Sequence, residues 1–460
     1  MRPTILIFTI VTWVGLNGPA LAADIPFPAG FLWGTATAAH QVEGGNSGNT
    51  WWDWEQVPGH IKNGDKSGLA ADHWNRFASD LDLARAINCN AYRFSVEWSR
   101  IEPADGVFDQ AAIGHYREVL AACRQRRLTP MVTLFHFTLP RWIGALGGFE
   151  SPVVVDRFAR FSRRMGQELG DLVDLWCTEN EPVVYALASY GNGVFPPGKT
   201  DVGVALRVYA RLIEAHGKAY RALHDSDRID ADGDGRPALV GIAKHLRVFD
   251  PYSPYSTPDI LAARALDQLF NRVFFHACTR GEARISGPAP GAPVESIHDL
   301  GLRGTMDYIG VNYYSRDIVK FNPASPLMAD LTVNQGSPTS DLGWEIYPEG
   351  IYRTLMSLKR YNLPVFITEN GVADGPDKLR KAFIRDHLHW IAQAISDGVD
   401  VRGYFHWSLM DNFEWAEGFW PRFGLYRVDY GTQARTLTEG GRFFSEVAGK
   451  NVLPGPDCRR

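Results

Sequence analysis

Two glutamates are the residues of this chain whose setting points to acid–base chemistry. Glu369 ends the short run 365–369, and Glu181 ends a second short run that begins at Leu175. The β-branched and aromatic residues of these runs are typical of buried strands, and parallel barrels gather reactive side chains at the carboxyl ends of their strands. A lone glutamate there is more often solvated or a helix cap. Two in matching settings suggest the pair that hydrolyses a glycoside, one as nucleophile and one as general acid and base.

The elements that would position this pair alternate regularly along the chain. The predicted strands are 31–36, 90–95, 129–135, 175–181, 238–243, 308–311, 365–369 and 401–406, and the predicted helices are 72–87, 109–127, 152–169, 202–224, 259–280, 348–361 and 376–396. We find no internal repeat, low-complexity segment or linker-like shift in composition. This pattern predicts an α/β fold that consists of a single (β/α)₈ TIM barrel with elaborated βα loops.

Polar or aromatic residues follow nearly every predicted strand. They are Gln41, Arg93, His136, Asn180 with Glu181, His245, Asn312, Glu369 and Trp407. In a barrel of parallel strands these positions share one rim, so we expect the side chains to line a common site.

Composition narrows the class of function. The formal net charge of the 460 residues is −5, which provides no basic surface for nucleic acid and no polybasic patch for a membrane. Aromatic residues make up 12% of the chain. Most aromatic side chains belong to cores, but sugar sites also use their rings as platforms, so the content leans towards a carbohydrate ligand.

The first residues resemble a secretory signal peptide. Arg2 supplies the positive start, residues 5–14 the apolar core, and Ala20 to Ala23 a cleavage site of small residues. The apolar run is too short for a membrane span. We therefore expect residues 1–23 to be removed, residues 24–460 to form the catalytic barrel domain, and the enzyme to be secreted or periplasmic.

The cysteines are odd in number and widely spaced. They are Cys89, Cys123, Cys177, Cys278 and Cys458. No CxxC pair occurs, which argues against a metal cluster. An oxidising compartment would allow one or two disulfides, whose pairing the sequence leaves open.

A short acidic segment matches half of a calcium-binding loop. Asp230, Asp232 and Asp234 have the spacing of the first ligands, but Gly241 stands where the loop needs its bidentate glutamate. The segment also precedes a predicted strand, on the face of a barrel that serves stability. We favour a solvated acidic turn over a metal site and expect no metal.

Five motifs together resemble the family-1 glycoside hydrolases, the retaining β-glucosidase and β-galactosidase family. The motifs are Phe31-Leu32-Trp33-Gly34-Thr35-Ala36, Tyr92-Arg93-Phe94-Ser95-Val96-Glu97-Trp98-Ser99-Arg100, Asn180-Glu181-Pro182, Ile367-Thr368-Glu369-Asn370-Gly371 and Asn412-Phe413-Glu414-Trp415. All five occur in one chain, in the family's order and with spacing that fits a barrel. The resemblance runs from Phe27 to about Val447.

The resemblance implies that Glu369 is the nucleophile and Glu181 the acid/base. A retaining mechanism needs their carboxyl groups about 5–5.5 Å apart and requires no cofactor, because two carboxylates and a water suffice. It further implies that Arg93 lies beside Glu369 and lowers its pKa, that Tyr314 donates a hydrogen bond to the same carboxylate, and that Asn312 supports this neighbourhood.

The resemblance also implies a set of sugar-binding side chains. Polar contacts to the glycone would come from Gln41, His136, Asn180 (on the 2-hydroxyl), Glu414 and Trp415, with Trp407 under the ring, Phe423 on the far wall and Trp344 as the aglycone platform. A carboxylate at 414 would repel phosphate, which excludes the branch that cleaves phosphorylated sugars. A glutamate at 181 excludes the thioglucosidases, which carry glutamine there.

Two residues depart from the family pattern. Phe137 replaces a tryptophan that follows the histidine in many members, and a phenylalanine cannot donate a hydrogen bond to a sugar. Glu179 occupies a position that is usually apolar, where it would add a charge to the site or form an ion pair. Both make the preferred sugar uncertain between glucose, galactose and fucose.

The sequence therefore predicts an exo-acting retaining β-glycosidase, above all a β-glucosidase, whose partner is a small glycoside or oligosaccharide. Two other functions are compatible with this fold. A carbohydrate-binding relative without activity would have lost one of the two glutamates, and here both are present. A transglycosylase would use the same residues, so the sequence does not separate it from a hydrolase. Linkage preference and oligomeric state stay open.

Overall fold

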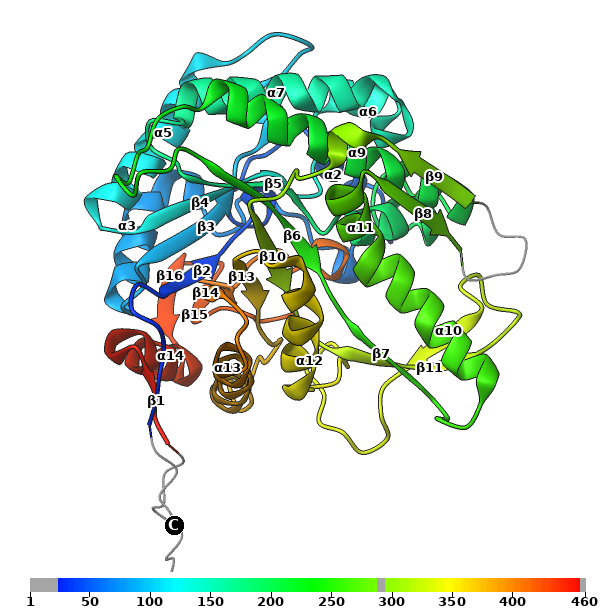
Figure 1. The fold of residues 1–460 in the computed structure, drawn as a ribbon. Coiled ribbons are helices and arrows are strands. Elements are labelled where there is room, and N and C mark those ends of the chain that lie inside the picture. The colour runs from blue at the N-terminus through cyan, green and yellow to red at the C-terminus, as the bar shows by residue number, and fades with distance from the viewer. Residues whose placement is uncertain (1–23, 288–293, 456–460) are drawn as a thin grey trace, which may run out of the picture.

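A closed barrel of eight parallel strands forms the centre of the computed structural model, which describes residues 24–287 and 294–455 (Figure 1). The strands are β2 (Leu32–Ala36), β3 (Ala91–Ser95), β4 (Thr129–Phe135), β5 (Leu175–Asn180), β6 (Leu239–His245), β10 (Tyr308–Asn312), β13 (Val365–Asn370) and β14 (Val401–Trp407). The barrel closes where β14 pairs with β2, with Gly403 opposite Leu32. The predicted (β/α)₈ barrel is confirmed, and all eight predicted strands lie in it.

Helices cover the outside of the barrel between successive strands. They are α3 (His73–Ala86), α5 (Gln110–Gln125), α7 (Val153–Leu169), α9 (Val202–Ser226), α12 (Glu349–Leu358) and α13 (Arg380–Ser396), and the shorter helices are α1 (Ala39–Val42), α2 (Thr50–Glu55), α4 (Trp98–Ile101), α6 (Arg141–Ala145) and α8 (Pro182–Ala186). Asp109 caps α5 by accepting the N–H groups of its first turn, and Asp201 caps α9 in the same way.

Two predicted helices differ from the structure. The predicted helix 259–280 is divided into α10 (Thr257–Asp267), a π-helical turn (Gln268–Arg272) and α11 (Val273–Arg280). In the π turn the Asn271 side chain bonds the backbone N–H and C=O of Arg247, a tertiary contact that a sequence pattern does not reveal. The helix predicted to begin at 376 begins at Arg380, because the Asp374 carboxylate caps the preceding turn.

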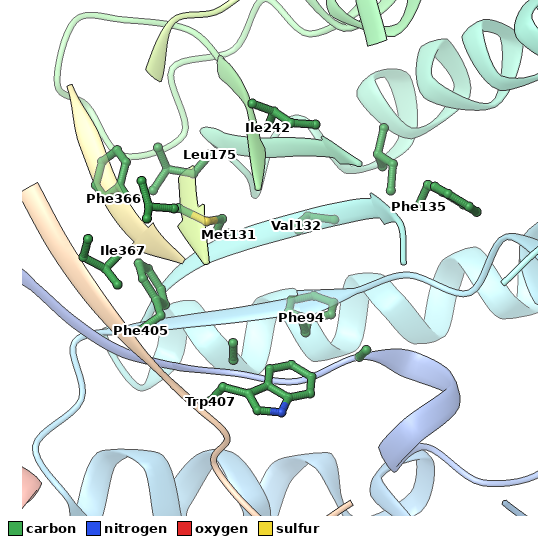
Figure 2. Close-up of a cluster of buried hydrophobic side chains, with 14 of the residues drawn as sticks. Phe94, Met131, Val132, Phe135, Leu175, Ile242, Phe366, Ile367, Phe405 and Trp407 are labelled. Carbon is green, nitrogen blue, oxygen red and sulfur yellow. The ribbon is translucent and has the colours of Figure 1, made fainter. Parts of the chain in front are cut away.

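The barrel interior is packed with large side chains from opposite strands. Figure 2 shows Met131, Leu175, Phe366 and Phe405 in this cluster, and all four are buried. Gly34 makes room for one of them, because a Cβ at this position would lie 2.4 Å from the Phe405 ring. The barrel is therefore closed below its mouth, which restricts chemistry to the carboxyl ends of the strands.

A small sheet that the sequence did not predict lies beside the barrel mouth. It consists of β7 (Val248–Pro251), β11 (Arg316–Phe321) and β12 (Ala329–Thr332), in segments that follow β6 and β10. Helix α10 covers it, with Leu266 and Val319 in a separate apolar cluster between helix and sheet. This sheet is the main elaboration of the βα loops and forms one wall of the site described below.

The remaining strands form pairs. They are the hairpin β8 (Glu282–Ser286) and β9 (Val294–His298), the hairpin β15 (Tyr426–Asp429) and β16 (Ala434–Leu437), and the pair β1 (Ile25–Pro26) and β17 (Val452–Leu453), with α14 (Glu439–Lys450) before β17. The β1–β17 pair joins the two ends of the described chain, which lie side by side in Figure 1. Asn451 reinforces it by accepting a hydrogen bond from the Trp33 indole at 2.9 Å.

Two sequence predictions, those on the signal peptide and on the fifth cysteine, concern residues outside the described ranges. The predicted signal peptide, residues 1–23, lies outside them, as does Cys458. The other four cysteines are buried thiols without disulfides. None of the helices in residues 24–287 and 294–455 is long and apolar enough to cross a membrane.

Candidate active site

A cleft of about 470 Å³ opens at the carboxyl ends of the barrel strands. Ten of the thirteen residues that the sequence singled out line it, namely His136, Asn180, Glu181, Tyr314, Trp344, Glu369, Trp407, Glu414, Trp415 and Phe423. The other three, Gln41, Arg93 and Asn312, lie behind the lining and are hydrogen-bonded to it. The predicted rim is thus a single site.

Glu369 is held by two donors at the end of β13. The guanidinium of Arg93 donates to Oε1 at 2.6 Å, and the hydroxyl of Tyr314 donates to Oε2 at 2.7 Å. All three side chains are buried. Because each carboxyl oxygen has its own donor, the orientation of the group is fixed, and the charge of the guanidinium favours its ionised form.

Glu181 stands at the turn between β5 and α8. Its backbone is left-handed, with φ of 49°, a conformation that costs a residue with a side chain about 1–2 kcal/mol. Pro182 follows at the first position of α8, where its fixed φ suits a helix start. The side chain of Glu181 accepts a hydrogen bond from Asn312 at 2.8 Å and lies 3.2 Å from Nδ1 of His245.

His245 is the site residue to which the sequence gave no role. It was expected on the rim because it ends β6, but nothing in the sequence indicated that it contacts Glu181.

Asn312 also differs from expectation. It was assigned to the neighbourhood of Glu369, whereas its amide bonds Glu181 directly and its carbonyl accepts the hydroxyl of Thr368 at 2.7 Å.

One hydrogen-bond network joins the two carboxyl groups. Oδ1 of Asn180 accepts from Arg93 at 2.7 Å and from Asn312 at 3.1 Å, and these residues in turn bond Glu369 and Glu181. Nδ2 of Asn180 lies 3.1 Å from Nε2 of His136. A shift of one carboxyl group would therefore disturb the donors of the other, so the network holds the pair as one unit.

The carboxyl groups of Glu181 and Glu369 influence each other's titration. Burial and the charge of Glu181 raise the pKa of Glu369 to about 7, although Arg93 and Tyr314 act in the opposite direction. Arg93 thus lowers the pKa as expected, but burial outweighs it. Burial also acts upward on Glu181, yet its contacts with His245 and Asn312 lower the net pKa. Two coupled carboxyl groups titrate as a pair, so the pair retains one proton up to about pH 7.

Polar atoms without protein partners lie at the end of the cleft that contains Glu414. Gln41 donates a hydrogen bond to Glu414 at 3.4 Å. The side-chain oxygen Oε1 of Gln41 has no hydrogen-bond partner among the described residues. Nδ1 of His136 is also buried without a partner in that part of the chain. Buried polar atoms are normally satisfied, so these are suited to a ligand rich in hydroxyl groups. Burial and the charges of Glu369 and Glu181 raise the pKa of Glu414 to about 8.

Aromatic rings enclose the same end. His136 stacks on Trp407 and on Trp415, with ring centroids 5.9 Å apart in each pair. Phe137 is buried and packs its ring edge-on against Trp415 at 5.2 Å. It therefore supports a wall of the cleft while offering no hydrogen bond. Trp344 lies on another wall, 5.6 Å from the Tyr314 ring.

Glu179 is neither an extra charge in the cleft nor part of an ion pair, so both expectations for it are wrong. Its side chain is fully buried, and both of its carboxyl oxygens lack a partner among the described residues. It lies close enough to Tyr209 of α9 and Cys278 of α11 to influence their titration. Burial raises the pKa of Glu179 well above its ordinary range and so favours the protonated form of this carboxyl behind β5.

The acidic segment before β6 forms a turn that closes on itself. Carboxylate oxygens of Asp174, Asp230 and Asp232 lie within 4.8 Å of one another. Asp230 accepts hydrogen bonds from the backbone N–H groups of Gly233 and Gly235, and Asp174 is paired with Arg124 at 2.8 Å. The turn lies at the amino end of β6, on the face opposite the cleft, and fits the predicted acidic turn.

Comparisons with known proteins point to one family. Residues 23–453 match the model of Glycosyl hydrolase family 1. The chain is 37% identical to Beta-glucosidase A of Thermotoga maritima, over 93% of this chain and 98% of that protein. It is 32% identical to a Beta-galactosidase of Pyrococcus woesei, over 92% and 97%. The solved structure of a beta-glycosidase from Pyrococcus horikoshii aligns with a TM-score of 0.85 and 37% identity, covering 94% of this chain and 96% of that chain.

Proposed function

Because the chain belongs to glycosyl hydrolase family 1 and is a glycosidase, we propose that it is a retaining exo-β-glycosidase that acts above all on β-glucosides. The observation that carries the proposal is the different anchoring of two buried carboxyl groups in one cleft. A permanent cation and a phenol hold Glu369, whereas an amide and an imidazole hold Glu181.

The anchoring suits a double displacement. Arg93 keeps a positive charge 2.6 Å from Glu369, while burial lowers the pKa of His245 and so disfavours a positive charge beside Glu181. We therefore assign the shared proton to Glu181 during the reaction. Glu369 attacks the anomeric carbon as Glu181 protonates the leaving oxygen, and Glu181 then deprotonates the water that releases the sugar from Glu369.

The proposed preference for glucose rests on the polar end of the cleft and on the relatives. Gln41, Glu414 and His136 offer acceptors and donors for glycone hydroxyls. One relative is named a β-glucosidase and another a β-galactosidase, so galactosides are the second candidate substrate. Transfer of the sugar to an alcohol would use the same residues, and an alcohol acceptor series would reveal it by its products.

The first experiment is a panel of 4-nitrophenyl β-glycosides of glucose, galactose, fucose, xylose and mannose. We expect turnover, with glucose highest. Absence of turnover on every member would overturn the proposed function, and a higher rate on galactose would support the second candidate.

Azide rescue then separates the two glutamates. With a 2,4-dinitrophenyl β-glucoside, Glu181→Ala should be accelerated by azide and yield the β-glucosyl azide, because Glu369 still forms the glycosyl-enzyme. Glu369→Ala should yield the α-azide if it is rescued. A β-azide from Glu369→Ala would contradict the assignment of roles.

A further inference from the structure

The cleft continues beyond Glu181 into a region with a different character. The His245 ring, which contacts Glu181, lies 5.5 Å from the ring of Phe270, and Phe270 lies 5.7 Å from Phe249. If Glu181 protonates the leaving oxygen, the leaving group must lie on its side of the glycosidic bond. The wall that runs from His245 to Phe249 is therefore the wall of the leaving-group half.

This half is lined by apolar side chains from elements outside the barrel. Phe270 comes from the π-helical turn that interrupts the helix after β7, and Phe249 and Leu331 come from β7 and β12. Leu327 and Leu342, from the neighbouring loops, also line the cleft. Leu331 is 40% exposed, an apolar rim position that a bound apolar group would cover.

The charged groups in this half are already paired with protein partners. Arg247 forms an ion pair with Asp317 at 2.7 Å and also donates to His245 at 3.2 Å. Glu417, which also lines the cleft, is paired with Lys62 at 3.1 Å. A second sugar would have to place its hydroxyls against leucine and phenylalanine, and the loss of their hydrogen bonds to water would oppose binding.

From these contacts we infer that the leaving-group half selects an apolar aglycone, an alkyl or aryl group, over a second sugar. The inference deepens the proposed function and rests on it. Alkyl and aryl β-glucosides are then the preferred substrates, and cellobiose and other oligosaccharides are the poorer ones.

A series of alkyl β-glucosides from methyl to hexyl tests the inference, with cellobiose as the polar comparison. Full burial of a methylene would raise kcat/KM by about fourfold. We expect a rise of at least about twofold per methylene, and a kcat/KM for hexyl glucoside at least about tenfold above that for cellobiose. A flat series, or cellobiose as the better substrate, would overturn the inference. Turnover of 4-nitrophenyl β-glucoside in the same preparation shows separately whether the proposed function holds.

Variants of the rim locate the effect. Leu331→Asn and Leu342→Asn should each lower the ratio of hexyl glucoside to cellobiose kcat/KM by about threefold or more. Leu300→Asn, at a leucine that is 79% exposed and does not line the cleft, serves as the matched control and should leave the ratio unchanged. An unchanged ratio in both rim variants, with wild-type folding by circular dichroism, would contradict the proposed wall.

Discussion

At the scale of single residues, Arg93 links the chemistry to the barrel. Its guanidinium contacts Glu369, Asn180, Thr133 and the carbonyl of Thr368, so that one buried cation joins β3 to β4, β5 and β13. The resemblance to the family implied the contact with Glu369. It could not indicate the contact with Asn180, because the pairing of side chains across strands depends on the register of the closed barrel.

The shared proton of the carboxyl pair gives a pH prediction. With methyl β-glucoside, whose leaving group needs protonation, kcat/KM should fall above about pH 7, where the pair that includes Glu369 loses its proton. With 2,4-dinitrophenyl β-glucoside, which departs without a proton, this basic decline should be absent. Steady-state kinetics of the wild-type enzyme from pH 4 to 9 on both substrates provides the check. A fall in kcat/KM at basic pH with both substrates would show that the group that titrates does not act as the proton donor.

Glu179 gives a prediction about stability. The pKa of its carboxyl is raised in the folded protein, so the folded state retains a proton that the unfolded state releases, and stability declines as pH rises above the ordinary carboxyl pKa. Glu179→Leu should therefore raise stability by about 1–4 kcal/mol at neutral pH, with a larger gain at pH 8 than at pH 5.

Chemical denaturation at the two pH values measures this gain. Glu118→Leu, at an exposed glutamate of α5, is the control and should show no pH-dependent difference. A loss of stability in Glu179→Leu at both pH values would indicate that the carboxyl makes favourable interactions in the native protein.

At the scale of elements, the eight barrel strands could be predicted because each is a short, largely apolar run that is buried on both faces over most of its length. The positions of Glu181 and Glu369 followed from the ends of these runs. The π-helical turn at Gln268–Arg272 and the sheet of β7, β11 and β12 could not be predicted. Their formation depends on tertiary contacts, such as that of Asn271 with Arg247, and short half-exposed strands carry little periodicity.

The hairpin β15–β16 depends on a buried ion pair. Arg435 of β16 contacts Asp80 of α3 at 2.9 Å, and His73 contacts the other oxygen of Asp80 at 2.8 Å. Arg435→Leu would leave Asp80 buried without its cation, so we expect a loss of about 3–5 kcal/mol. Arg402→Leu, which breaks an exposed pair with Asp400, should cost less than about 1 kcal/mol. Equal midpoints of urea denaturation for the two variants would contradict this difference.

At the scale of the whole molecule, the β1–β17 pair connects the first and the last strands of the described chain. Asp24 directly precedes β1, and cleavage near Ala22 or Ala23 would leave β1 at the start of the mature chain. We propose that the protein is exported and processed there. Mass spectrometry of the protein secreted by its host should find the mature amino terminus at residue 23 or 24, and an intact residue 1 on the exported form would contradict the proposal.

The β1–β17 pair also predicts which truncations the fold tolerates. Deletion of residues 451–460 removes Asn451 and β17, with the hydrogen bond to Trp33, and should lower the thermal midpoint. Deletion of residues 456–460 leaves every one of these contacts in place and should not change the thermal midpoint. Equal midpoints for both deletions, as measured by differential scanning calorimetry, would show that the pair contributes little to stability.

The joined ends have a further consequence for how the molecule can be attached to something else. Asn451 bonds Trp33 near the start of β2, so both ends of the described chain lie beside the amino ends of the barrel strands, whereas the cleft opens at their carboxyl ends. A carrier domain, a surface anchor or an immobilisation tag fused at either end would orient the enzyme with its mouth towards the medium. The same adjacency makes the molecule suitable for circular permutation. A short linker could join the present ends, and new termini could be placed in a loop on the face of the barrel opposite the cleft.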